Sequence, residues 1–295
     1  MKQKVTIGLV VGSVLFSLLV FYTFNEMTSK RVSDEQRYNM LASLLKEEVK
    51  INSHDNLQLH GFYIPYFRSQ DETVKTIILV HGYSVSSAYM LHYLRTFLEH
   101  GWDILLIDQR GHGQSEGKYA SYGFHEKFDL DRWVSWVQQR NGEDSIIGLL
   151  GVSMGAGTVL EYAAINQDAK FIIADCPYSD LNELIKYQIW QRAHLPSFPL
   201  INAVNVVLSQ RVGFTLQDVS PINAIKDQEI PIMFIHGSED TFVPTYMSED
   251  LYNAKKGKKK LLIVGGAGHG NSYMKNDLLY EKEMWLFIDE VLAAD

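Results

Sequence analysis

Six short, nearly continuous apolar runs recur between residues 76 and 264. They are rich in Ile, Leu and Val, and lie at Thr76–Val80, Ile104–Ile107, Ile146–Leu150, Phe171–Ala174, Ile230–Ile235 and Leu261–Val264. Runs of this length and composition are typical of strands covered on both faces, and the helical stretches between them suit crossover connections. The pattern predicts a mostly parallel, twisted sheet with helices on both faces.

Two earlier segments show a different pattern. Residues 48–53 and 57–64 alternate between polar and apolar side chains, and His54-Asp55-Asn56 joins them. Alternation on both sides of a turn-forming link is the signal of a β-hairpin. We therefore expect an antiparallel start to the sheet, about eight strands in total, and a domain that begins near Glu47.

The amino-terminal segment has no polar periodicity. Val5–Phe24 contains no Asp, Glu, Lys or Arg, and a helix of about 20 residues covers roughly 30 Å, the hydrocarbon thickness of a bilayer. Lys2 and Lys4 precede the run and predict a cytoplasmic amino terminus with an extracytoplasmic domain. No small-residue cleavage site follows, which favours a single-pass signal anchor over cleavage and secretion, the alternative.

These patterns divide the chain into three parts. We predict a signal anchor over residues 1–24, a polar connector over 25–46 and an α/β domain over 47–292. Within that domain, 181–228 has no obvious strand, and two helices are expected at Leu184–Trp190 and Leu200–Leu208. They predict a small helical lid above an apolar pocket; the alternative is that they extend the core.

Composition narrows the classes of partner. The chain is 46% hydrophobic and 21% charged, as in globular proteins, and its net charge of -8 argues against a nucleic-acid partner. Cys176 is the single cysteine, so an intramolecular disulfide and a cysteine-based zinc site are excluded. The basic stretch Lys255–Lys260 is expected to be a solvated loop before a strand. The oligomeric state stays open.

One serine lies where a predicted strand meets a predicted helix. Gly151-Val152-Ser153-Met154-Gly155 follows the apolar run at 146–150 and precedes a helical stretch. Glycine on each side lets strand and helix cross closely around a strained turn, the pattern called a nucleophile elbow. Ser153 is therefore the candidate nucleophile, at the carboxyl edge of the sheet.

A serine hydroxyl needs a general base. Among the histidines after Ser153, His194 falls in the predicted lid and His236 within a predicted strand, whereas His269 follows the last strand in a glycine-rich loop. Strands that run parallel end at one edge of their sheet, so His269 should emerge beside Ser153. It is the candidate base.

The base needs an acid that orients it. Asp240 follows the strand predicted at 230–235 and should reach the same edge, while Glu239 and Asp175 are the alternatives. Two backbone amides are the expected oxyanion donors. Met154 supplies one because it follows the nucleophile, and Tyr83, directly after the strand at 76–80, supplies the other.

Five segments together resemble the α/β-hydrolase superfamily, in its order, over about residues 47–292. They are His81-Gly82-Tyr83, Asp108–Ser115, Gly151–Gly155, His236–Pro244 and Gly268-His269. The chain is similar to membrane-anchored or secreted bacterial serine esterases and lysophospholipase-like proteins, and also to the prolyl-oligopeptidase branch. The resemblance implies an α/β-hydrolase fold, with Ser153 as nucleophile, Asp240 as acid and His269 as base. It implies a structural loop at Asp108–Ser115.

The expected activity is hydrolysis of carboxylic esters, small or lipid-like, through an acyl-enzyme. No metal or organic cofactor is expected, and the expected partners are an ester substrate and a membrane. A serine peptidase and a non-catalytic hydrolase-like binding protein are the alternatives. The sequence contains no β-propeller ahead of the domain, which disfavours an oligopeptidase, and an intact Ser, Asp and His set disfavours a pure binder.

Overall fold

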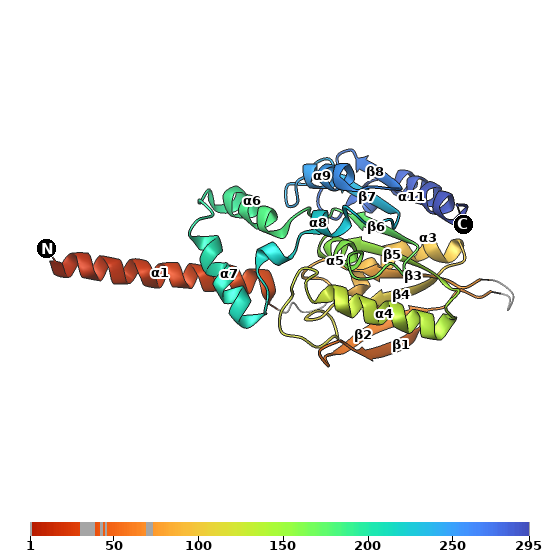
Figure 1. The fold of residues 1–295 in the computed structure, drawn as a ribbon, viewed down its shortest axis with the longest axis horizontal. Helices are drawn as coiled ribbons and strands as arrows, with labels where there is room; N and C mark the ends of the chain where they lie inside the picture. Colours follow the sequence, from red (N-terminus) through yellow and green to blue (C-terminus); the bar gives the residue numbers. More distant parts are fainter. Residues whose placement is uncertain (1, 30–38, 42–43, 45, 69–72, 295) are drawn as a thin grey trace.

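Eight strands form one sheet in the order β1-β2-β4-β3-β5-β6-β7-β8 (Figure 1). The computed structural model describes residues 2–29, 39–41, 44, 46–68 and 73–294. The strands are β1 (Glu47–Asn52), β2 (Gln58–Ile64), β3 (Lys75–Val80), β4 (Asp103–Ile107), β5 (Ile146–Val152), β6 (Phe171–Asp175), β7 (Ile232–Gly237) and β8 (Lys259–Val264).

The strand directions confirm the predicted sheet. β1 and β2 form an antiparallel hairpin, and β2 pairs antiparallel with β4. Every pair from β4 through β3, β5, β6 and β7 to β8 is parallel. β7 begins two residues later than predicted, because Pro231 has no N–H to donate to a neighbouring strand.

Helices cover both faces of this sheet. One apolar cluster joins the sheet to α3 and α11, and a second joins its other face to α4, α5, α8 and α9. The helical elements around the sheet are η1 (Ser87–Tyr93), α3 (Leu94–Glu99), α4 (Glu126–Asn141), α5 (Met154–Tyr162), α8 (Pro221–Ile225), α9 (Tyr246–Ala254), α10 (Ser272–Lys275) and α11 (Asp277–Leu292).

The interval between β6 and β7 is helical, as its lack of a strand pattern predicts. It holds α6 (Leu181–Ala193), α7 (Leu200–Arg211), the short η2 (Leu216–Asp218) and α8. Asp180 begins α6 because its carboxylate accepts a hydrogen bond from the Glu183 amide at 3.1 Å. α6 and α7 stand apart from the sheet at one end of the molecule (Figure 1). We call them the lid helices.

The first helix, α1 (Lys2–Thr28), projects from the same end of the molecule as the lid helices (Figure 1). It is long and apolar enough to cross a membrane: Val11–Thr28 has a mean hydropathy of 1.3, and only 22% of that window is buried. The helix continues four residues beyond the predicted limit at Phe24. Most of the predicted connector, at 30–38, 42–43 and 45, lies outside the described residues.

The last turns of α1 pack against the rest of the protein. Val20, Phe24 and Met27 lie three or four positions apart, share one helix face and are buried. They belong to a third apolar cluster that also contains residues of α6 and α7 and the side chain of Met154. The end of the apolar helix is thus part of the folded domain.

The basic stretch before β8 differs from the expected solvated loop. Lys255 is buried, and its Nζ donates to the Gln228 carbonyl at 2.7 Å. Lys259 and Lys260 belong to β8, which begins two residues earlier than predicted. The Nζ atoms of these two donate to backbone carbonyls at 2.7 and 2.9 Å. The lysine ammonium groups therefore bond to backbone carbonyls of neighbouring elements, and two of the lysines form the start of β8.

A carboxyl group is buried where β6 ends. Asp175 is 1% exposed, and the Tyr93 hydroxyl donates to its Oδ2 at 3.3 Å. Burial raises the pKa of Asp175 to about 6, although hydrogen bonds from Tyr280 and Tyr93 act in the opposite direction. Ionisation of this carboxyl is therefore less favourable in the folded protein than in the unfolded chain.

Replacing Asp175 by Asn removes this titration. With a pKa above the ordinary value of 3.8, wild-type Asp175 contributes stability that is complete below 3.8 and is lost as pH rises through about 6. Asp175→Asn does not undergo this loss. We expect the difference in the free energy of unfolding, variant minus wild type, to be about 2 kcal/mol larger at pH 8 than at pH 4. Urea unfolding in detergent measures it, with exposed Asp144→Asn as control; parallel pH profiles would contradict the assignment.

Candidate active site

Ser153 occupies a strained turn between β5 and α5. Its backbone has φ 56° and ψ −115°, in the region that L side chains rarely adopt. A Cβ on Gly151 would lie 2.2 Å from the Gly155 carbonyl oxygen, and a Cβ on Gly155 would lie 2.1 Å from that of Val80. Strand, turn and helix can cross at this separation only with glycine at both positions.

The three candidate catalytic side chains meet at the carboxyl edge of the sheet. The Ser153 Oγ lies 2.8 Å from the His269 Nε2, and the His269 Nδ1 lies 2.7 Å from the Asp240 Oδ2. Ser153 follows β5, Asp240 follows β7 and His269 follows β8. The structure therefore joins the candidate nucleophile, base and acid in that order by two contacts.

Two backbone amides anchor the Asp240 carboxylate, and two histidines lie against it. Its Oδ1 accepts from the backbone amides of Phe242 and Val243, each at 2.9 Å, and its Oδ2 is 3.2 Å from the His236 Nε2 as well as close to His269. Burial alone would raise the pKa of Asp240, but the hydrogen bonds from His236 and His269 hold it below its ordinary value. The carboxylate is thus ionised and oriented toward the imidazole of His269.

The loop after β3 passes beside the nucleophile. A Cβ on Gly82 would lie 3.3 Å from the Ser153 Cβ. The buried His81 holds this loop: its Nδ1 donates to the Gly82 carbonyl at 2.7 Å, and its Nε2 accepts from the Gln109 amide at 3.0 Å. Burial lowers the pKa of His81, which suits a neutral ring with one donor and one acceptor. The peptide plane that carries the Tyr83 N–H is therefore held in one orientation.

Residues 108–115 make structural contacts. Asp108 accepts the amides of Ser87 and Gln114 at 2.8 and 2.9 Å, and the Ser115 hydroxyl donates to the Asp108 carbonyl at 2.6 Å. Gln109 also donates through its side chain to the His81 carbonyl at 2.6 Å. This segment supports the loop after β3, in agreement with the structural role that the sequence resemblance implies.

Three of the alternatives, Glu239, Asp175 and His194, do not join this chain of hydrogen bonds. Glu239 is exposed, and its backbone amide donates to the Ala267 carbonyl at 2.9 Å. Asp175 accepts the Ser153 amide through its backbone oxygen at 2.8 Å, while its side chain faces Tyr93. His194 ends α6 in a left-handed conformation.

Sequence reasoning missed two neighbours of the triad. His236 lies inside β7 as predicted, but its Nε2 reaches Asp240; the spacing of four residues in His236-Gly237-Ser238-Glu239-Asp240 is the signal that could have found it. The ring centroid of Phe242 lies 4.8 Å from that of His269. Phe242 shields one side of the imidazole.

Two groups of potential metal ligands occur within the described part of the chain. Each has its ligand atoms within 4.8 Å of one another: Cys176, Asp240 and His269, and His54, Asp55 and Asp129. In the first group, both ring nitrogens of His269 already face Ser153 and Asp240. In the second, the Arg110 guanidinium donates to both carboxylates, at 2.6 and 3.0 Å. In the first group the ring nitrogens of His269 are thus already engaged, and the second group already holds a cation.

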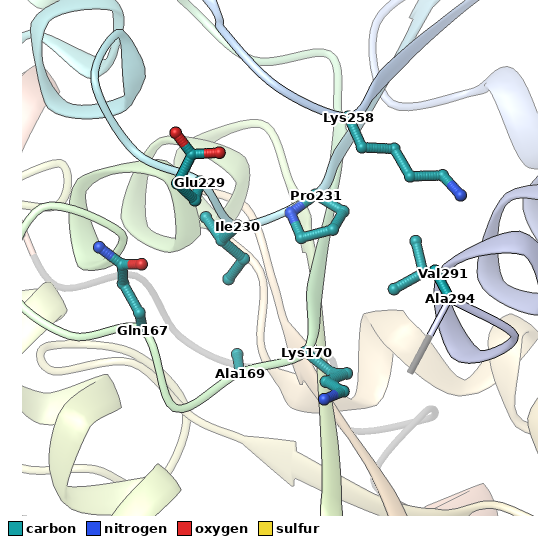
Figure 2. Close-up of a pocket in the computed structure, with 9 residues that line it drawn as sticks. All are labelled: Gln167, Ala169, Lys170, Glu229, Ile230, Pro231, Lys258, Val291 and Ala294. Atoms are coloured by element: carbon teal, nitrogen blue, oxygen red, sulfur yellow. The ribbon is translucent and has the colours of Figure 1, made fainter.

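One surface pocket lies at the opposite edge of the sheet from the triad (Figure 2). Its lining includes Lys170, Pro231 and Lys258, which directly precede the amino ends of β6, β7 and β8. The triad residues follow the carboxyl ends of their strands. This pocket is therefore separate from the candidate active site.

Comparisons with known proteins agree with this geometry. A family model described as the alpha/beta hydrolase fold matches residues 75–219. The uncharacterized protein YqkD of Bacillus subtilis is 34% identical over an alignment of 307 positions, gaps included. The alignment covers 98% of this chain and 98% of YqkD. The chain belongs to the α/β-hydrolase superfamily. The superfamily and fold that the sequence motifs predict are thereby confirmed.

Two further likenesses concern activity within the α/β-hydrolase superfamily. A solved structure of the Pyrococcus furiosus esterase Pf2001 has a TM-score of 0.70 and 25% sequence identity, and the match covers 90% of this chain and 97% of that one. A Mycoplasma pneumoniae protein whose name proposes an esterase or lipase is 25% identical over 259 residues, 79% of this chain and 92% of that protein. These likenesses support a hydrolase.

The close crossing at the elbow of this α/β-hydrolase can be tested with one methyl group. We expect Gly155→Ala to lower the free energy of unfolding by about 3 kcal/mol or more, because the Val80 carbonyl oxygen would lie 2.1 Å from the new Cβ. Gly265→Ala is the matched control, since a Cβ at that position would meet nothing within 4 Å. Equal stability of the two variants in urea unfolding would contradict the steric argument.

Proposed function

We propose that this protein is a serine esterase with Ser153, His269 and Asp240 as its catalytic triad. The observation that carries the proposal is the unbroken pair of contacts at 2.8 and 2.7 Å that links the hydroxyl, the imidazole and the carboxylate. The same spacing recurs in unrelated serine hydrolases because the chemistry requires it. The likeness to a solved esterase adds support for an ester substrate.

The proposed reaction begins with attack of the Ser153 Oγ on the ester carbonyl carbon, while the His269 Nε2 takes the hydroxyl proton. Asp240 stabilises the resulting imidazolium through Nδ1. His269 then gives the proton to the leaving alkoxide as the C–O bond breaks. Water repeats the sequence on the acyl-enzyme and releases the carboxylic acid. None of these steps requires a metal or an organic cofactor.

We further propose that the amides of Met154 and Tyr83 bind the oxyanion. Met154 is the first residue of α5, and the first amides of a helix have no partner within it. The N-terminus of a helix also favours negative charge. Tyr83 belongs to the loop that passes beside Ser153. Backbone donors of this kind need no reorganisation when charge develops.

Ser153→Ala tests the nucleophile. We expect kcat for p-nitrophenyl esters to fall by about 10⁴-fold or more, because the acyl-enzyme can no longer form, and labelling by a fluorophosphonate to disappear. Ser209→Ala, at an exposed position on α7, is the matched control and should keep both. Wild-type protein that is folded but takes no label would overturn the enzyme proposal.

The comparison of esters with aminoacyl anilides separates esterase from peptidase. We expect kcat/KM to be larger for the p-nitrophenyl esters. Larger values for the anilides would replace the esterase proposal by a serine peptidase. Ser153→Ala should abolish turnover of either substrate class, which makes the outcome independent of contaminating activities.

We also propose that α1 is an uncleaved membrane anchor that leaves the hydrolase domain outside the cytoplasm. Its apolar stretch is long enough, and its last turns contribute Val20, Phe24 and Met27 to a buried cluster of the domain. Removal of the helix would expose the apolar partners of these side chains to water.

The mature protein is therefore expected to retain residues 1–24 and to sediment with membranes after a carbonate wash. Intact mass spectrometry of protein purified from membranes with detergent measures the first point. A mass that begins well after residue 24, with the hydrolase in the soluble fraction, would show cleavage and secretion instead.

A further inference from the structure

The carboxyl end of α1 is hydrogen-bonded to the active-site loops. The Tyr83 hydroxyl donates to the Glu26 carbonyl at 2.7 Å, and the Tyr122 hydroxyl donates to the Met27 carbonyl at 2.8 Å. The last carbonyls of a helix have no partners within it, so these contacts complete the helix end. Tyr83 also lies in the loop beside Ser153. Tyr83 therefore connects the end of α1 to the loop next to the candidate nucleophile.

A groove of about 250 Å³ runs between α1 and the lid helices. Apolar side chains from both walls line it: Leu19, Tyr22 and Met27 from α1, and Ile185, Ile189 and Leu200 from the lid helices. Two of its polar side chains are already engaged. The Thr23 hydroxyl donates to the Leu19 carbonyl at 2.9 Å, and the Gln188 amide donates to the Phe242 carbonyl at 3.2 Å. Glu26 and Arg192 are the charged residues of the lining, and the rest of it is mostly apolar. The groove therefore suits an apolar chain better than a peptide, which needs hydrogen-bond partners along its length.

Two residues that line the groove are hydrogen-bonded to neighbours of the candidate triad. On one side, Glu26 lines the groove and accepts from Tyr83. On the other, Gln188 lines it and bonds to Phe242, whose ring contacts that of His269. The groove is therefore one residue removed from the Ser153 loop on one side and from the His269 ring on the other, and the proposal places the acyl chain of an ester bound at Ser153 in it.

The surroundings of the groove point to the bilayer as the source of that chain. Trp190, Leu195 and Phe198, at the end of α6 and in the link to α7, are 57%, 41% and 72% exposed. α6 lies at the end of the domain from which α1 projects (Figure 1). Trp side chains such as that of Trp190 favour the headgroup level of a membrane. With α1 in the bilayer, the groove would open where lipid acyl chains begin.

We propose that this groove is the acyl-binding subsite for the long chain of a membrane ester lipid, and that α1 forms one of its walls. This inference rests on the esterase function proposed above. It assigns α1 two roles, because the helix would both hold the enzyme at the membrane and select substrates by chain length. Deletion of α1 would accordingly alter specificity as well as location.

Groove-filling substitutions test the subsite. Ile189→Trp fills the groove from the lid wall and Leu19→Trp from the α1 wall, and Val206→Trp, at a 56% exposed position on α7, is the matched control. The readout is the ratio of kcat/KM for p-nitrophenyl dodecanoate to that for p-nitrophenyl acetate, measured in detergent. We expect both groove variants to lower the ratio by about tenfold or more, since each lost methylene contact weakens long-chain binding. The control should leave it unchanged.

A measurement on the wild-type protein makes the test independent of variant folding. A dodecyl fluorophosphonate with a terminal diazirine should label Ser153 and, after irradiation, crosslink to peptides of α1 or α6. A ratio within about twofold of wild type in folded groove variants, or crosslinks confined to other elements, would overturn the subsite. Absence of turnover for both esters, with no labelling of Ser153, would instead overturn the esterase proposal.

Discussion

The geometry of the whole site depends on how closely β5 and α5 cross at Ser153. With hydrogen in place of Cβ at Gly151 and Gly155, the first turn of α5 approaches the end of β3, where the loop that carries Tyr83 begins. The strained backbone of Ser153 directs its hydroxyl toward His269 and places the helix N-terminus beneath it. One steric constraint thus brings the proposed nucleophile, a proposed donor amide and the positive end of a helix dipole together.

Much of the fold and the triad could be predicted because their signals are local. Buried parallel strands leave short apolar runs, and a parallel sheet collects whatever follows its strands at one edge. Ser153, Asp240 and His269 each follow a different strand, so their proximity could be inferred from strand order without any knowledge of contacts. Element boundaries are harder to predict where charged residues belong to a strand. β8 begins with Lys259 and Lys260, whose ammonium groups bond to backbone carbonyls of neighbouring elements.

The features that the sequence does not predict depend on contacts between distant segments. Nothing near Glu26 or Tyr83 indicates that they bond, because they are 57 residues apart and the partner on α1 is a backbone carbonyl. Phe242 likewise has no local mark as a neighbour of His269. The sequence shows that α1 is apolar all round, but it cannot distinguish a face that meets lipid from one that meets the lid helices.

That distinction has a physical consequence for the proposed anchor. In hydrocarbon, packing Val20, Phe24 and Met27 against the lid would gain no hydrophobic free energy, because lipid tails are equally apolar. In water the same burial stabilises by about 1.5–3 kcal/mol for each side chain. The docked turns of α1 therefore suit the aqueous side of the interface. The apolar residues 5–19 then remain for the bilayer, about 22 Å of helix. The bilayer would thin locally, or Lys2 and Lys4 would extend to the far headgroups, to match its hydrocarbon thickness. The proposed groove would lie at the headgroups, where the ester bonds of lipids are found.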